Sequence, residues 1–253
     1  MLVISGYNAS YSKIIFNILM IQTLSAFWQF LKKPKPLKLS KDNKSLWRDM
    51  LWLLILDLLF AGLIMITYCI LVHFKVIKEY IEEIDLLKKY GLIATLFIAC
   101  IFAPIVEEFL FRWHLTKKYI PIYFVCFTLG LIANYFIKSS YLIWPIYIFF
   151  LLVALVVQVY FKRIGIRKRL VFQQQSFVYL FYYSAIIFGL THLTNIKGLT
   201  LSDPAFIIFV ISQAFAGLSL GYLRIKYGLL YSILLHCFLN FVMVTLEILF
   251  QLN

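Results

Sequence analysis

Long apolar runs separated by short polar stretches dominate the chain, and this pattern predicts a membrane protein. A helix needs about 20 consecutive apolar residues to cross the hydrocarbon core of a bilayer, and most of these runs approach or exceed that length. The strong runs occupy residues 51–74, 91–115, 121–137, 141–161, 177–193, 204–226 and 229–250. An earlier run at 14–31 includes Asn17, Gln22 and Gln29, so it either spans the membrane or lies in its interface. We expect an all-α, polytopic transmembrane helix bundle of about eight membrane segments, in a single integral-membrane domain over residues 1–253.

The polar stretches give the expected order of loops. Residues 32–50 form a basic, proline-containing linker, and residues 162–170 form a second basic loop. Residues 75–90 carry apolar side chains at helical spacing among balanced charges, which predicts an amphipathic surface helix. Of the 24 Lys and Arg residues, 16 fall in alternate loops and 7 on the other side. Positively charged loops stay in the cytoplasm, so this asymmetry predicts that the loops with the 16 basic residues lie on the cytoplasmic side of the membrane.

Composition supports the membrane class and argues against nucleic acid as a partner. Hydrophobic residues make up 63% of the chain and charged residues 14%, whereas a soluble domain is roughly 45–50% apolar. The net charge of +13 is explained by basic loops beside a membrane, so membrane lipid is the expected partner. The four cysteines fall inside apolar runs without CxxC spacing, which predicts buried apolar residues. No cleaved signal peptide is expected, and His73 and His114, near the ends of runs, are expected at the interface.

One apolar run, residues 101–115, carries charges at membrane depth. A charge there costs about 2.5–3.5 kcal/mol on insertion scales, so such residues usually face a protein interior and serve a function. Glu108 and Arg112 are four residues apart on one helix face and can form an ion pair. Glu107 lies about 100° around the helix and has no local partner. An ion pair with a purely structural role is the alternative.

Three more polar side chains lie in other apolar runs. His192 ends the 177–193 run, and His236 and Asn240 share one face of the last helix. Together with Glu107 they supply a general base, two imidazoles and an amide donor for an oxyanion, a set suited to hydrolysis of an amide by water. Each alone has a simpler interpretation as a packing residue or a hydrogen bond between helices.

At these residues the chain resembles the CPBP intramembrane proteases, also called Abi or CAAX-protease-like proteins, which are related to the type II CAAX prenyl endopeptidase. The motifs EExxxR, FxxxH and HxxxN follow in order, each on its own apolar run. They comprise Glu107, Glu108 and Arg112; Phe188 and His192; and His236 and Asn240. The resemblance covers a core at about 91–118 and 177–250, with extra spans at about 121–161.

The resemblance implies a role for each motif residue. Glu107 would activate the attacking water, His192 would hold that water or move its proton, and His236 with Asn240 would stabilise the oxyanion. The other three residues would support the site: Glu108 and Arg112 would brace the helix, and Phe188 would pack behind it. No cofactor follows with certainty; zinc, held by Glu107, His192 and His236, stays open.

Two departures from the family pattern affect the expected geometry. Trp113 stands where the family often has glycine after the arginine. About 80 residues separate Arg112 from His192, a longer gap than in many relatives. Strict alternation of spans then puts His192 near the outer end of its helix, with Glu107 near mid-depth and His236 in the inner half.

The resemblance predicts an intramembrane endopeptidase acting on a CAAX-type substrate, prenylated or not, or on a bacterial leader or bacteriocin-related peptide. A proton-coupled transporter is an alternative, because buried Glu, His and Arg also form proton relays. A non-catalytic scaffold or immunity protein is another. The Lys-, Ile- and Phe-rich composition favours the bacterial inner membrane; a eukaryotic host would indicate the endoplasmic reticulum.

Overall fold

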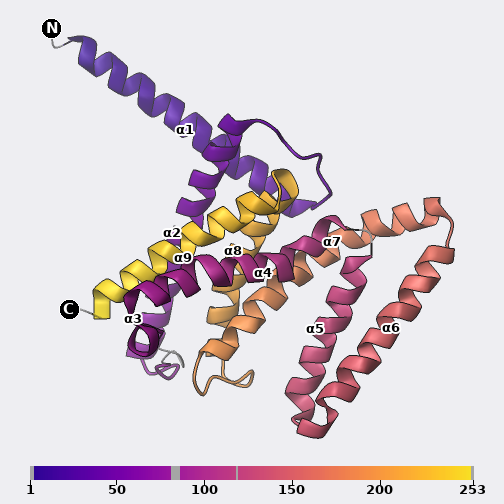
Figure 1. Cartoon of the computed structure of the whole chain (residues 1–253). Coiled ribbons are helices and arrows are strands. Elements are labelled where there is room, and N and C mark those ends of the chain that lie inside the picture. Colours follow the sequence, from indigo (N-terminus) through magenta and orange to yellow (C-terminus); the bar gives the residue numbers. More distant parts are fainter. Residues whose placement is uncertain (1–2, 81–85, 118, 252–253) are drawn as a thin grey trace.

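The computed structural model describes residues 3–80, 86–117 and 119–251, and this part of the chain is helical without a β-strand (Figure 1). The long helices are α1 Val3–Lys32, α2 Asn43–His73, α3 Leu86–Phe97, α4 Ala103–Arg112, α5 Ile120–Ile137, α6 Ile143–Arg163, α7 Ile166–Thr191, α8 Ala205–Lys226 and α9 Leu229–Gln251. Four short segments complete the order: a π-helix, η1 Ile98–Phe102, and the 3₁₀ helices η2 Trp113–Thr116, η3 Ser140–Leu142 and η4 His192–Asn195.

Seven stretches of the described chain are long and apolar enough to cross a membrane, which confirms a polytopic helix bundle. They are Asn43–His73, Leu87–Thr116, Ile120–Ile137, Ser140–Arg163, Ile166–Asn195, Ala205–Lys226 and Leu229–Leu249. The second stretch joins α3, η1, α4 and η2 into one span. Helix α1, which contains the apolar run 14–31, is not among the seven.

The prediction of a surface helix at 75–90 is wrong for residues 75–80, which are not helical. Residues 81–85 lie outside the described chain, and residues 86–90 are helical as the first turn of α3, Leu86–Phe97. Helix α2 ends in a Schellman motif, in which Lys75 takes a positive φ of 57°. The N–H of Val76 bonds to the carbonyl of Leu71, and that of Lys75 to Val72. This arrangement satisfies the last carbonyls of the helix and turns the chain away from the helix axis.

Helices α2, α7, α8 and α9 form the centre of the molecule, with α4 packed against α9 and α7. Small residues bring the helix axes close, as expected for membrane bundles. A Cβ on Gly217 of α8 would lie 3.2 Å from the Cα of Ala185 in α7, and one on Gly189 of α7 would lie 2.6 Å from the carbonyl oxygen of Val210. The main core includes Leu53, Phe181, Leu220, Leu223 and Leu235.

A buried polar cluster attaches α1 to this centre. Asp49 of α2 is fully buried and accepts hydrogen bonds from Thr23 of α1 at 2.7 Å, Lys226 of α8 at 2.6 Å and the hydroxyl of Tyr227 at 2.8 Å. The lysine balances the carboxylate charge, so the buried pair is compensated.

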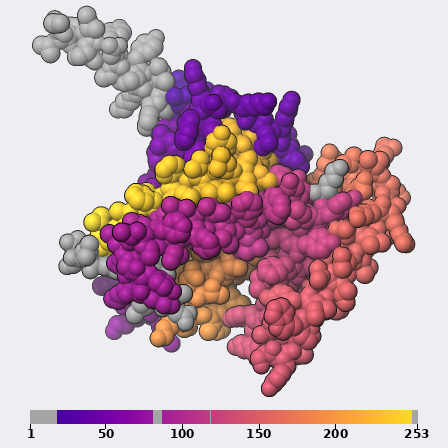
Figure 2. All heavy atoms as spheres, in the orientation of Figure 1, coloured from indigo at the N-terminus to yellow at the C-terminus, as the bar shows by residue number. Residues whose placement is uncertain are grey.

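Helices α5 and α6 form a hairpin at one edge of the bundle, where the sequence predicts the extra spans 121–161. The two helices pack closely on each other, and Tyr123 donates to Gln158 at 2.8 Å across their interface. Figure 2 shows the hairpin standing apart from the lower part of the bundle, with a hollow between them.

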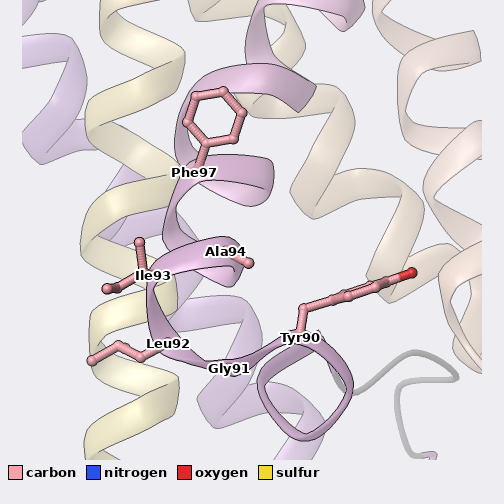
Figure 3. Close-up of a pocket in the computed structure, with 6 residues that line it drawn as sticks. All are labelled: Tyr90, Gly91, Leu92, Ile93, Ala94 and Phe97. Atoms are coloured by element: carbon pink, nitrogen blue, oxygen red, sulfur yellow. The ribbon is translucent and has the colours of Figure 1, made fainter.

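Helix α3 contains a kink after its first turn, within the stretch Leu87–Thr116. Gly91 takes φ 77° and ψ 171°, a conformation that favours glycine. Figure 3 shows an open hollow at this kink, around which Tyr90 and Leu92 point in different directions. Its lining is almost wholly apolar and includes none of the charged residues of α4.

Two local expectations from the sequence are wrong. His114 is 1% exposed and stacks on Phe124 with ring centroids 3.8 Å apart, because η2 turns it inward between α4 and α5. Cys69 is exposed on the outer face of α2, although Cys100 and Cys126 are buried as expected.

Candidate active site

The acidic pair lies on α4, directly after the π-helix η1. In η1 the N–H of Ala103 bonds to the carbonyl of Ile98, the wider spacing typical of a π turn. Pro104 follows η1 without a break in helical geometry, and because it has no N–H it cannot donate to a carbonyl of the preceding turn. Helix α4 ends at Arg112 and continues as the 3₁₀ helix η2, so the helix changes form at Trp113. Glu107 and Glu108 are therefore presented on a short, sharply bounded helix.

Glu107 faces two imidazoles from different helices. Its Oε2 lies 3.8 Å from Nε2 of His192 and 3.6 Å from Nε2 of His236. This oxygen is buried and has no hydrogen-bond donor among the residues that the structure describes, although the side chain as a whole is 26% exposed. Buried acceptors without partners are rare, and they often mark a catalytic group or an ordered water.

His192 is the first residue of η4, where α7 ends. Its Nδ1 lies 2.8 Å from the carbonyl oxygen of Phe188. A carbonyl can only accept, so Nδ1 carries the proton and Nε2 is left facing Glu107. The ring of Phe188 packs against His192 at 4.5 Å and against His236 at 5.8 Å, while Arg112 lies 4.0 Å over the ring face.

Glu108 lies beside Glu107 but faces the protein interior. It is fully buried, with Arg112 Nη1 at 3.5 Å and His236 Nδ1 at 3.1 Å from its Oε1. Its Oε2 accepts a hydrogen bond from the hydroxyl of Ser232. The contact with Arg112 is the i,i+4 ion pair that the sequence predicts, and the contact with His236 joins α4 to α9.

Asn240 lies one turn after His236 and reaches the π-helix. Its Nδ2 donates to the carbonyl oxygen of Ala99 at 2.8 Å. One amide hydrogen is thus engaged with the backbone, and the second is available to another acceptor. The bond connects α9 to the segment that precedes the acidic pair.

The separation in depth that strict alternation predicts for His192, Glu107 and His236 is absent. Figure 1 shows α4 and α9 running at a steep angle to α5 and α6. Inclined helices bring together residues that lie at different distances from their own helix ends. The gap of about 80 residues is taken up by the α5–α6 hairpin and the long α7, which begins at Ile166 and not near residue 177.

Zinc is the cofactor that the sequence leaves open. Among the described residues, no group of three or more His, Cys, Asp or Glu side chains is arranged to hold a metal ion. The two imidazole nitrogens that face Glu107 Oε2 lie 3.8 Å (His192) and 3.6 Å (His236) from it.

Comparison with known protein families shows to which family the chain belongs. The profile of the type II CAAX prenyl endopeptidase Rce1-like family matches residues 89–242, more than half of the chain. The chain belongs to this family. The match runs from α3 to Asn240 and beyond, so it includes all three motifs. Neither the curated proteins nor the solved structures contain a match to the chain.

Membership of the Rce1-like family identifies a CAAX-type intramembrane protease at the level of the family, in a multi-pass membrane protein. Two features of the site were missed from the sequence. Ser232 is an ordinary serine in an apolar run, and only its distance of one turn from His236 distinguishes it. The π turn at Ile98–Phe102 has no composition signal, although Pro104 marks the start of a new helix.

Proposed function

We propose that the protein is an intramembrane endopeptidase that hydrolyses a peptide bond near the membrane with a glutamate-activated water. The observation that carries the proposal is the buried Oε2 of Glu107, which lies between two imidazole nitrogens and has no protein donor. A water beside the Glu107–His192 pair can donate to the carboxylate and reach the imidazole. Family membership supports proteolysis and the geometry supports the role of Glu107.

In the proposed reaction, Glu107 takes a proton from the water while the oxygen of that water attacks the peptide carbonyl carbon. The C–O bond forms and the carbonyl oxygen becomes an oxyanion, which the second amide hydrogen of Asn240 stabilises. His236 Nε2 adds a second donor when the His236 ring carries a proton on both nitrogens. When the C–N bond breaks, Glu107 returns the proton to the leaving amine. His192 Nε2 orients the water, because its Nδ1 is held by Phe188.

The proposed substrate is a peptide segment presented at the membrane. The acidic pair lies within a span of the bundle, so the scissile bond has to reach it from the bilayer or its surface. A prenylated CAAX-type chain end suits a host with prenyltransferases, and a leader or bacteriocin-related peptide suits a bacterial host. In both cases a membrane-bound segment carries the scissile bond to Glu107.

The test is hydrolysis of membrane-proximal peptides by the purified protein in detergent or liposomes. Glu107→Gln should reduce kcat about 10²- to 10⁴-fold, the usual contribution of a general base. Glu79→Gln, on the exposed loop after α2, is the matched control and should leave kcat unchanged. Activity should persist in the presence of a zinc chelator. Full activity of Glu107→Gln would reject the proposal, and proton flux into liposomes that depends on Glu107 would favour a transporter.

A further inference from the structure

Ser232 and His236 lie one turn apart on α9, and both contact the same carboxylate. The hydroxyl of Ser232 donates to Oε2 of Glu108, and His236 Nδ1 lies 3.1 Å from Oε1. Ser232 and Glu108 are fully buried, and His236 is 4% exposed. Helix α9 therefore holds both oxygens of a carboxylate on α4.

This arrangement determines which nitrogen of His236 is a donor. An ionised carboxylate can only accept, so Nδ1 must carry the proton in the contact with Glu108. Nε2 is then left for Glu107 and the reacting groups, as an acceptor in the neutral ring and as a donor when the ring takes up a proton. Partners of this kind commonly fix the tautomer and orientation of an imidazole.

The orientation of Glu108 depends on the serine. Arg112 Nη1 lies 3.5 Å from Oε1, so the arginine and the histidine both approach the same oxygen of the carboxylate. Ser232 holds the other oxygen and so fixes the rotation of the carboxylate about its last bond. Without the hydroxyl, the carboxylate can turn toward Arg112 and away from His236.

The hydroxyl has one proton and two acceptors nearby. Besides Glu108, the carbonyl oxygen of Leu220 in α8 lies 2.9 Å from Ser232 Oγ. A hydrogen bond to an ionised acceptor is about twice as strong as one between neutral groups, so the proton goes to Glu108. The carbonyl of Leu220 lies inside α8, where the helix supplies its own donor.

We propose that Ser232 is a positioning residue of the active site: it holds Glu108 so that Glu108 keeps His236 in the orientation with Nδ1 protonated and Nε2 toward Glu107. This inference rests on the proposed protease function. It assigns a role in the reaction to a residue outside the three motifs.

The test compares Ser232→Ala with Ser219→Ala. Ser219 of α8 is a matched control, because it is also fully buried and also donates to a buried carboxylate, that of Asp57, at 2.7 Å. Ser232→Ala should lower kcat roughly 10- to 100-fold with KM within about twofold, whereas Ser219→Ala should leave both unchanged. Ser232→Thr, which keeps a hydroxyl, should restore most of the activity.

A second readout does not depend on activity. Nitrogen chemical shifts of ¹⁵N-labelled histidine, assigned with His236→Gln, should show one tautomer of His236 in the native protein and in Ser219→Ala. In Ser232→Ala the two tautomers should be mixed. An unchanged His236 signal, or equal losses of kcat in the two alanine variants, would overturn the inference. Failure of the protease proposal is distinguishable, because it would appear as an absence of Glu107-dependent hydrolysis in the native protein.

Discussion

Asn240 holds the backbone carbonyl of Ala99 through a 2.8 Å hydrogen bond from its side-chain amide. Ala99 lies in the π-helix η1, where the wider turn changes the direction of carbonyls that an α-helix would keep in its own ladder. The HxxxN motif therefore contacts the acidic helix α4 and the segment before it, since His236 contacts the acidic pair and Asn240 contacts Ala99.

Asn240→Ala should lower both stability and kcat. The variant leaves the Ala99 carbonyl without its side-chain donor, a loss of about 1–2 kcal/mol in the free energy of unfolding. Denaturant unfolding in detergent measures the loss, with Thr245→Ala as control, because Thr245 bonds to a backbone carbonyl on the exposed side of the same helix. Equal stability of the two variants would contradict a structural role for Asn240.

Arg112→Ala should destabilise the protein strongly. The ion pair with Glu108 is almost completely buried, so removal of the arginine leaves an uncompensated charge and costs about 3–5 kcal/mol. Glu107→Gln, which breaks no protein hydrogen bond to Oε2, should cost far less. Thermal unfolding separates the two variants. If Arg112→Ala has the same melting temperature as the native protein, the buried pair does not stabilise the fold.

Gly189→Ala should separate α7 from α8 and move His192. A Cβ at this position would lie 2.6 Å from the Val210 carbonyl oxygen and 3.1 Å from the Ala214 nitrogen, both backbone atoms that cannot move alone. Overpacking of this kind costs about 1–3 kcal/mol, and kcat should fall as well because His192 lies three residues further on.

Gly62→Ala is the control. A Cβ at Gly62 would meet no neighbouring atom within 4 Å, so this variant should be neutral or stabilising by up to about 1 kcal/mol. Equal melting temperatures of the two variants would show that the α7–α8 contact is not tight.

Tyr80 and Asp203 should hold two loops together only within a window of pH. The hydroxyl of Tyr80 donates to Asp203, which lowers the pKa of the carboxyl and raises the pKa of Tyr80 to about 12. A lowered carboxyl pKa stabilises the contact above an unfolded value of about 3.9, and this is lost as the pH falls through the folded pKa. The tyrosine contribution is present below about pH 10 and is lost as the pH rises through about 12.

Hydrogen exchange of residues 74–80 checks this window. The backbone N–H of Tyr80 donates to Tyr68 at 2.8 Å, so its protection reports the position of the loop. Protection should be higher at pH 7 than at pH 2.5 after correction for intrinsic rates. Tyr80→Phe should lose this difference; a pH dependence that survives in the variant would show that another group holds the loop.

The sequence predicts the class of fold and the ion pair of Glu108 with Arg112 well, because both depend on local patterns. Apolar runs of membrane length identify the spans, and the spacing of Glu108 and Arg112 predicts their ion pair. Depth at the site was mispredicted for His192, because counting along straight, parallel spans ignores the inclination of α4 and α9. The contact of Ser232 with Glu108 is equally invisible in the sequence, since it joins residues 124 positions apart.

The loop after α2 shows a similar limit. Residues 75–80 have helical periodicity, but the left-handed conformation of Lys75 follows from the end of α2 and from Ile77, which is buried at 8% exposure. Helical periodicity shows only which side chains are apolar. Here one of them, Ile77, is buried in a turn and not on the face of a helix. His114 was likewise placed at the interface from its position near a run end, although its partner Phe124 comes from the following helix.

The π turn sets the rotational position of the acidic helix. An α-helix gains about 100° of rotation with each residue, and a π turn accommodates one residue more than an α turn does. If the segment Ile98–Phe102 closed into regular α-helix without losing a residue, the helix after it would turn by about 100°. The carboxylates would then face away from both imidazoles, so a protein with every motif residue intact would lose the contacts of Glu107 with His192 and His236.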